Sequence, residues 1–163
     1  MNKKTSDIAT MGLFTAIAII FGYVESQIPV FVSVPGIKLG LANLSVLYIL
    51  IRYRFRDACA VSVIRILVIG FLFGNAFSIL YSLAGASLSL VVMTLLLRTG
   101  KASIYGVSMA GGITHNIAQL TVAAFLVRNV NLFYYAPVLL ISGVVTGLLI
   151  GFLTKETMAR IRF

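Results

Sequence analysis

The sequence predicts an all-α membrane protein with six transmembrane helices, and three observations lead to this prediction. The chain has 163 residues, of which 60% are hydrophobic and 10% are charged, whereas about a quarter of the residues in a soluble domain are charged. Its apolar residues form stretches close to the ~20 residues that a spanning helix needs. Its basic residues gather between alternate stretches, as in cytoplasmic loops. One membrane domain over residues 1–163 accounts for the whole length.

Breaks in the apolar pattern predict six helices, in order at residues 5–24, 39–51, 58–73, 76–97, 103–127 and 135–154. The first stretch has no small-residue cleavage site and further spans follow it, so we interpret it as a retained helix rather than a signal peptide. The second helix is short and the third contains Arg65. These two helices therefore differ most from a typical span.

Polar and glycine-containing segments separate the predicted helices. Residues 52–57 form a polar hairpin after the second helix, and Gly74-Asn75 favours a tight turn before the fourth. Residues 98–101 end the fourth helix, and residues 128–131 lie between the fifth and the sixth. A short basic tail follows the last helix.

The distribution of basic residues predicts that both termini lie in the cytoplasm. Only Lys38 and Arg128 then fall in outward connections. Ten cations fall on the inner side: Lys3, Lys4, Arg52, Arg54, Arg56, Arg98, Lys101, Lys155, Arg160 and Arg162. Topology and attraction to anionic lipid explain the net charge of +9. We therefore expect a multi-pass protein of the cell membrane, with the bilayer and not nucleic acid as its surroundings.

Catalytic, metal and redox chemistry have little support in the sequence. Cys59 is the only cysteine, so the chain has no internal disulfide framework or thiolate cluster. His115 has no neighbouring acid or thiolate, which argues against a metal site. No Gly-x-x-x-x-Gly-Lys-[Ser/Thr] pattern is present, so ATP-driven work would need another subunit. We expect no catalytic residue, no cofactor and no metal.

Polar side chains within the spans are the candidates for a binding site, because a charge at a helix centre costs about 2.5 to 3.5 kcal/mol on insertion scales. Arg65 lies about seven residues into the third helix, where it either packs between helices or holds an anionic group. On the fifth helix His115 and Gln119 share a face, with Asn116 one position round. These three side chains either link helices by hydrogen bonds or, as we prefer, bind a ligand.

The first outward connection, residues 25–43, mixes apolar residues with proline and glycine, and we interpret it as an ordered lid. Lys38 and Asn43 flank the start of the second helix, where backbone N–H groups attract anions. The alternative is an ordinary interfacial loop with Lys38 at lipid headgroups. The predicted substrate-binding set is Lys38, Asn43, Arg65, His115, Asn116 and Gln119, and its cations indicate an anionic ligand.

Small residues spaced by four occur on two helices. On the sixth helix, Gly143, Gly147 and Gly151 are expected to pack against the rest of the chain. On the first helix, Gly12 and Ala16 form a shorter pair near the cytoplasmic end. For that pair a contact with a partner subunit remains open beside internal packing.

Two strings, Pro-Gly-Ile-Lys-Leu-Gly-Leu-Ala-Asn at 35–43 and His-Asn-Ile-Ala-Gln-Leu at 115–120, resemble a bacterial membrane family. It is known as heptaprenyl diphosphate synthase component I, or Gx transporter. That family is similar in size and layout to the S components of energy-coupling factor (ECF) transporters. The resemblance implies a bacterial cell membrane and a ligand pocket gated by the first outward loop. It also implies that Gly12 and Ala16 contact a coupling subunit driven by ATPases, although the usual pattern there is Ala-x-x-x-Ala.

The expected function is that of a substrate-binding or transport subunit for an anionic or phosphate-bearing small molecule, such as a flavin or an isoprenoid. The alternative is a non-catalytic membrane accessory subunit of polyprenyl (heptaprenyl) diphosphate synthesis, working with a soluble prenyl synthase. Prenyl synthases resemble one another in paired Asp-rich motifs that bind magnesium. This chain has only Asp7 and Asp57, which cannot build that centre. A purely structural scaffold is the third hypothesis.

Overall fold

Six α-helices make up most of the described part of the chain in this computed structural model, which describes residues 3–27 and 40–161. They are α1 (Lys3–Gln27), α2 (Leu41–Arg52), α3 (Phe55–Phe73), α4 (Ala76–Thr99), α5 (Ile104–Val127) and α6 (Ala136–Arg160). A 3₁₀ helix, η1 (Val130–Tyr135), precedes α6. These two described ranges contain no strand. The predicted all-α class is confirmed for them.

Four helical segments of the described chain are long and apolar enough to cross a membrane: Thr5–Gln27, Ala76–Thr99, Ile104–Val127 and Val130–Arg160. α2 is apolar but has only 12 residues. α3 has 19 residues and carries three charged side chains, Arg56, Asp57 and Arg65. The chain is therefore a multi-pass membrane protein in which α2 and α3 are unusual, as the sequence indicated.

Several helix ends differ from the prediction because polar residues extend or cap the helices. α1 and α6 continue into basic segments that we had assigned to the termini, and Lys and Arg are good helix formers. The predicted hairpin at 52–57 is shorter, because α3 already begins at Phe55. There the Asp57 carboxylate accepts a hydrogen bond from the Arg54 backbone N–H (3.1 Å). The turn before α4 forms as predicted, since Asn75 Oδ1 accepts from the Ser78 N–H (2.8 Å).

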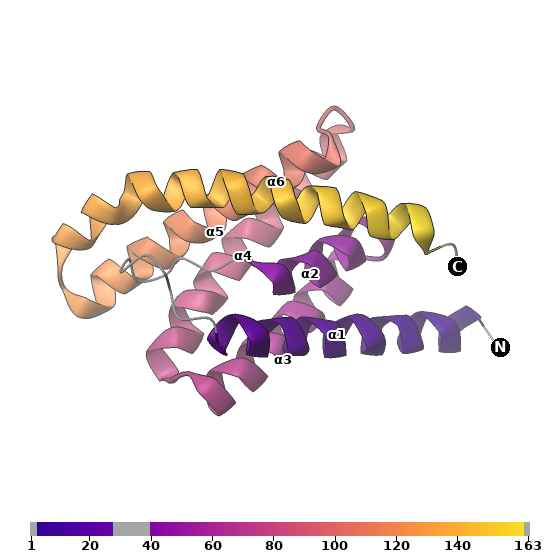
Figure 1. Cartoon of the computed structure of the whole chain (residues 1–163), viewed down its shortest axis with the longest axis horizontal. Coiled ribbons are helices and arrows are strands. Elements are labelled where there is room, and N and C mark those ends of the chain that lie inside the picture. The colour runs from indigo at the N-terminus through magenta and orange to yellow at the C-terminus, as the bar shows by residue number, and fades with distance from the viewer. Residues whose placement is uncertain (1–2, 28–39, 162–163) are drawn as a thin grey trace.

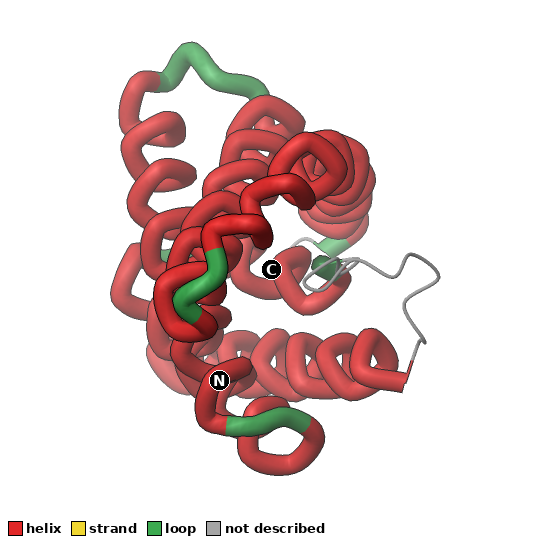
Figure 2. Tube along the Cα trace, turned by 90° about the vertical axis from the view of Figure 1, so that its left-hand side faces the viewer, coloured by secondary structure: helices red, strands yellow, loops and turns green. Residues whose placement is uncertain are grey.

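The helices form a ring in which α1 packs on α2 and α3, α4 packs between α3 and α5, and α6 packs between α5 and α2. α2 also contacts α3, and its residues 44–50 are all buried. Figure 1 shows α2 between α1 and α6, with the start of α1 and the end of α6 at the same end of the bundle. Figure 2 shows that the connections within residues 40–161 are short. Packing is most extensive among α4, α5 and α6.

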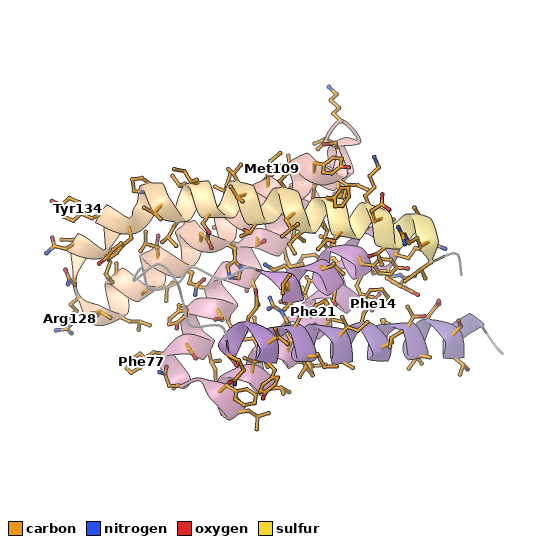
Figure 3. All side chains as sticks on the ribbon, viewed as in Figure 1. Phe14, Phe21, Phe77, Met109, Arg128 and Tyr134 are labelled. Atoms are coloured by element: carbon orange, nitrogen blue, oxygen red, sulfur yellow. The ribbon has the colours of Figure 1, made fainter. Side chains whose placement is uncertain are left out.

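Stacked aromatic rings join α1 to the central helix. Phe14 lies on the side of α1 that faces α2 (Figure 3), and its ring stacks on Tyr48 with centroids 4.1 Å apart. Both side chains are 2% exposed. Because aromatic side chains bury a large apolar area, this pair anchors the middle of α1 on α2.

The glycines of α6 bring its backbone against α5. A Cβ atom on Gly143 would lie 2.9 Å from the Ile113 nitrogen, and one on Gly147 would lie 2.6 Å from Met109 Cα. Gly112 on α5 meets Gly143, since a Cβ there would lie 2.5 Å from the Gly143 oxygen. Such small residues let helices approach closely in membranes. The ridge predicted on the sixth helix is therefore a packing surface within the chain.

The opposite face of α6 carries large exposed apolar side chains, among them Val138, Ile141, Val145, Leu148 and Phe152. A soluble monomer rarely exposes so large a continuous apolar surface, so this face is suited to lipid. Figure 3 places Phe77, Arg128 and Tyr134 at the end of the bundle opposite the end of α6. Exposed aromatic side chains at this end match the belt found at membrane surfaces.

We predict that Gly147→Leu destabilises the protein by about 1 to 3 kcal/mol, because the new side chain would overpack the α5–α6 interface. The matched control is Gly12→Leu, since a Cβ on Gly12 meets no atom within 4 Å. Thermal unfolding of detergent-purified protein, followed by the exposure of the single thiol of Cys59, measures both variants. Equal midpoints for the two variants would contradict this account of the interface.

Candidate functional site

The guanidinium of Arg65 meets the start of α2. Arg65 Nη2 donates a hydrogen bond to Asn43 Oδ1 over 2.7 Å. The Nε atom of Arg65 is buried and has no acceptor among the described residues. Two of the predicted site residues, from different helices, are thus in direct contact.

Glu25, near the end of α1, completes this cluster. Its Oε1 accepts a hydrogen bond from the Leu41 backbone N–H (2.9 Å), and its carboxylate attracts the charge of Arg65. The first N–H groups of a helix have no partner within the helix, and a negative charge there is favourable for the helix dipole. Glu25, Asn43 and Arg65 therefore tie the ends of α1 and α2 to the middle of α3.

From the sequence, Glu25 was predicted only as the first residue of the outward connection at 25–43. The signal that could have singled it out is its position, because the chain has four acidic residues and the other three lie in segments assigned to the cytoplasmic edge. An acid far from that edge needs a partner within the bundle. The sequence does not say which cation that partner is.

The cluster lies at depth because α2 is short. The rise of about 1.5 Å per residue places Leu41 about 16 Å from Arg52, the last residue of α2, whereas the hydrocarbon core of a bilayer is about 30 Å thick. Arg65 lies ten residues after Phe55, the first residue of α3, which is about 15 Å along the helix. The start of α2 and the guanidinium therefore meet near the middle of the bundle, where an isolated charge is costly.

A small cavity of about 30 Å³, mainly apolar but with four polar side chains in its wall, borders Asn43 and lies between α2, α4, α5 and α6. Its polar side chains are those of Asn43, Ser89, Ser108 and Thr146, and its glycines are Gly40, Gly111, Gly112 and Gly147. The Ser89 hydroxyl donates to the Gly111 carbonyl (2.9 Å). The volume has room for one or two groups the size of water. We call this space the central cavity.

The polar residues of α5 face two different neighbours. Asn116 Nδ2 donates to the carbonyl of Leu139 on α6 over 2.8 Å. His115 lies against α4, where a Cβ on Gly85 would come within 3.1 Å of its ring. Gln119 is 5% exposed, and its Nε2 has no acceptor among the described residues. None of the three lines the central cavity, so their ligand contact stays a prediction while Asn116 already links two helices.

The remaining predicted residues lie apart from this cluster. Lys38 is outside the described residues. Gly12 and Ala16 are both exposed on the outer face of α1, and the space around Gly12 is open. That face is accessible to another helix, and the partner contact stays a prediction.

The chemical groups around the cluster and the cavity are a guanidinium, a carboxylate, one amide, hydroxyls and backbone N–H groups. Within residues 3–27 and 40–161, no three His, Cys, Asp or Glu side chains come together as metal ligands would. A guanidinium beside a helix start can hold an anionic oxygen by charge-assisted hydrogen bonds. The arrangement is thus suited to binding and orienting an anionic group.

The helical fold with its apolar outer surface and buried charge defines a multi-pass membrane protein. The chain belongs to the family described as heptaprenyl diphosphate synthase component I, whose family model matches residues 14–157. This match confirms the resemblance seen in the sequence, and it includes Glu25, Asn43 and Arg65. Comparisons with curated proteins and with solved structures found no match.

We predict that the Asn43 and Arg65 side chains are energetically coupled by about 0.6 to 2 kcal/mol, the range of interhelical hydrogen bonds in membranes. Asn43→Leu alone removes the acceptor and leaves the cation buried, whereas Arg65→Met together with it removes both groups. A double-mutant cycle on unfolding free energies in detergent measures this coupling. As a control, Arg65→Met should combine additively with Thr121→Val, an exposed site on α5. Additive effects for the Asn43 and Arg65 pair would refute the coupling.

Proposed function

We propose that this chain is a substrate-binding or transport subunit of the membrane, similar to an ECF S component, for an anionic or phosphate-bearing small molecule such as a flavin or an isoprenoid. The observation that carries the proposal is the position of Arg65. Its guanidinium lies at the start of a short helix, where it bonds Asn43, a residue that lines the central cavity, and it keeps one buried N–H group without an acceptor in the described chain.

The balance of charges at this site favours an anion. Arg65 contributes one positive charge and the start of α2 about half of one, while Glu25 contributes one negative charge, so the sum stays positive. If the cluster only held helices together, Glu25 and Asn43 would be sufficient partners for Arg65. They leave the Arg65 Nε–H group without an acceptor, however, and an unsatisfied polar group in the membrane interior costs several kcal/mol. A ligand oxygen would remove this cost.

The start of α2 is a further reason to propose an anionic ligand. In transporters, helices that begin inside the membrane present their positive ends to anionic groups. The central cavity admits only a small part of such a ligand, such as phosphate oxygens. Gly40, which lines the cavity, directly follows residues 28–39. The proposed ligand therefore extends from the cavity toward the end of the bundle where α2 begins.

The proposal includes six crossings of a bacterial cell membrane with both termini in the cytoplasm. Its support is that α1 starts and α6 ends at the same end of the bundle (Figure 1). The exposed side chains of Arg54, Arg98 and Lys101 lie in the loops or at the helix ends assigned to that side. The energy source would be a separate ATPase-driven coupling subunit, with the Gly12 and Ala16 face as its contact.

We expect direct titration calorimetry of the purified protein with flavin mononucleotide and with geranyl diphosphate to detect binding of at least one probe. Arg65→Met should raise the Kd about tenfold or more, the scale for losing one charge-assisted hydrogen bond. Arg128→Gln is the control, because Arg128 is exposed at the end of α5 and outside the cluster. Equal affinities in both variants, or no binding of either probe to the unsubstituted protein, would reject the proposal.

A second function is favoured by the family match. In this alternative the chain is a non-catalytic membrane subunit that works with a soluble prenyl synthase in polyprenyl diphosphate synthesis. The soluble partner would supply the magnesium-binding carboxylates, since the chain has four acidic residues in all. The membrane subunit would receive or hold the lipid product.

The second function predicts that a soluble prenyl diphosphate synthase from the same cell co-purifies with this chain and turns over faster when the chain is present in vesicles. Product formation from isopentenyl diphosphate, with empty vesicles as control, measures the effect. Binding of a probe at Arg65 without any effect on the synthase would support the transport function alone. If the chain makes the synthase faster and Arg65→Met does not change that rate, the chain takes part in prenyl diphosphate synthesis without using the central site.

A further inference from the structure

Glu25 occupies the place where an anionic ligand would bind at the start of α2. Its Oε1 accepts a hydrogen bond from the Leu41 backbone N–H (2.9 Å), and Leu41 is the first residue of α2. The Glu25 carboxylate also attracts the charge of Arg65. A helix N-terminus and a guanidinium are both groups with which proteins hold anions. A carboxylate of the chain itself therefore uses the two groups that the proposed ligand needs.

The charges of the site disfavour the presence of Glu25 and an anionic ligand at the same time. Arg65 and the start of α2 contribute about one and a half positive charges, and Glu25 cancels one of them. A phosphate with about two negative charges would then leave a clear negative excess in the membrane interior, where uncompensated charge is costly. If the same phosphate replaces Glu25, the excess is only about half a negative charge. Exchange of one anion for the other is therefore the arrangement closer to neutrality.

The last turn of α1 allows such an exchange. Among residues 23–27, Glu25 is half-buried and the other four are exposed, and helix ends fray readily. The ring of Tyr23 meets that of Phe73 on α3 with centroids 4.9 Å apart. The Glu25 side chain can therefore turn away from Leu41 toward the exposed side of this turn, while Tyr23 keeps the end of α1 beside α3.

We propose that Glu25 is an internal competitor of the ligand: its carboxylate pairs with Arg65 and the start of α2 when the site is empty, and the anionic group of the ligand displaces it. This inference rests on the transport function proposed above and adds a regulation of the same site. The carboxylate spares the empty protein an unpaired guanidinium charge in the membrane. It also weakens binding, which speeds the release of the ligand.

Removing the negative charge of Glu25 tests the competition. Glu25→Gln keeps a side-chain oxygen that can accept from the Leu41 N–H and removes only the charge. Titration calorimetry uses the same probes as for Arg65→Met, flavin mononucleotide and geranyl diphosphate. The Kd of the probe that binds should fall about tenfold in Glu25→Gln, because the probe no longer has to displace a like charge.

A matched control makes the same change of charge elsewhere. Glu156 lies on α6 and pairs with Arg160 over 3.6 Å. It is near the end of α6, which lies beside the start of α1, whereas Glu25 is near the end of α1 (Figure 1). Glu156→Gln should therefore leave the Kd of the probe unchanged.

Neutral counterparts of the probes separate competition for the anion site from a change in its shape. Riboflavin and geraniol lack the phosphate groups, so they have no reason to displace a carboxylate. Glu25→Gln should not tighten their binding. A site that merely became wider or looser would change the affinities of the neutral and the phosphorylated probes alike.

A second measurement uses the unsubstituted protein and keeps the inference testable if Glu25→Gln fails to fold. The glutamates of the chain are Glu25 and Glu156, so isotope labelling of glutamate carboxyl carbons gives two signals in solid-state NMR. Loss of one signal in Glu156→Gln assigns them. The phosphorylated probe should move the Glu25 signal toward that of a solvated carboxylate and leave the Glu156 signal in place.

Three results would overturn this inference and leave the proposed function intact. In the first, Arg65→Met weakens the binding of a phosphorylated probe while Glu25→Gln leaves its Kd equal or higher. In the second, Glu25→Gln tightens the binding of neutral and phosphorylated probes alike. In the third, the probe binds and the Glu25 signal does not move. If neither phosphorylated probe binds the unsubstituted protein, the proposed function is rejected and the inference falls with it.

Discussion

The pairing of one half-buried arginine, Arg65, with its neighbours is the constraint on which the arrangement of this bundle depends. A guanidinium in the middle of a membrane helix must find hydrogen-bond acceptors and an opposite charge within the protein. Here Asn43 supplies an acceptor and Glu25 supplies the charge. Because these groups come from α1, α2 and α3, satisfying Arg65 also fixes where α1 ends and where α2 begins relative to α3.

Helix α2 is short, and its shortness has two effects on the site. It brings a helix start, with its unpaired N–H groups, into the interior of the bundle. It also leaves α2 surrounded by other helices, so that residues 44–50 are all buried. The glycines of α6 complete the enclosure by drawing α5 and α6 together beside the same space. The close packing of α5 on α6 and the central cavity therefore depend on the same small residues.

The sequence was informative about what each helix contains and less so about which helices meet. Composition and hydropathy predicted the all-α membrane class, the turn at Asn75 and the packing role of Gly147. Arg65 was singled out as a charge within a span and Asn43 as a residue at the start of the second helix. The sequence could not pair them, because their contact depends on how α2 and α3 cross. Glu25 was missed for this reason. Helical periodicity placed Asn116 one position round from the face of His115 and Gln119, and its side chain accordingly meets α6 whereas His115 meets α4.

The packing of the helices also has a mechanical consequence. Charges and stacked rings join α1, α2 and α3, whereas close helix packing joins α4, α5 and α6, and the two triplets meet more sparingly, at α3–α4 and α2–α6. The central cavity borders the α2–α6 contact, and a second cavity, of about 140 Å³, lies between α3 and α4. A molecule bound in either cavity would touch both triplets at once and would hold them together.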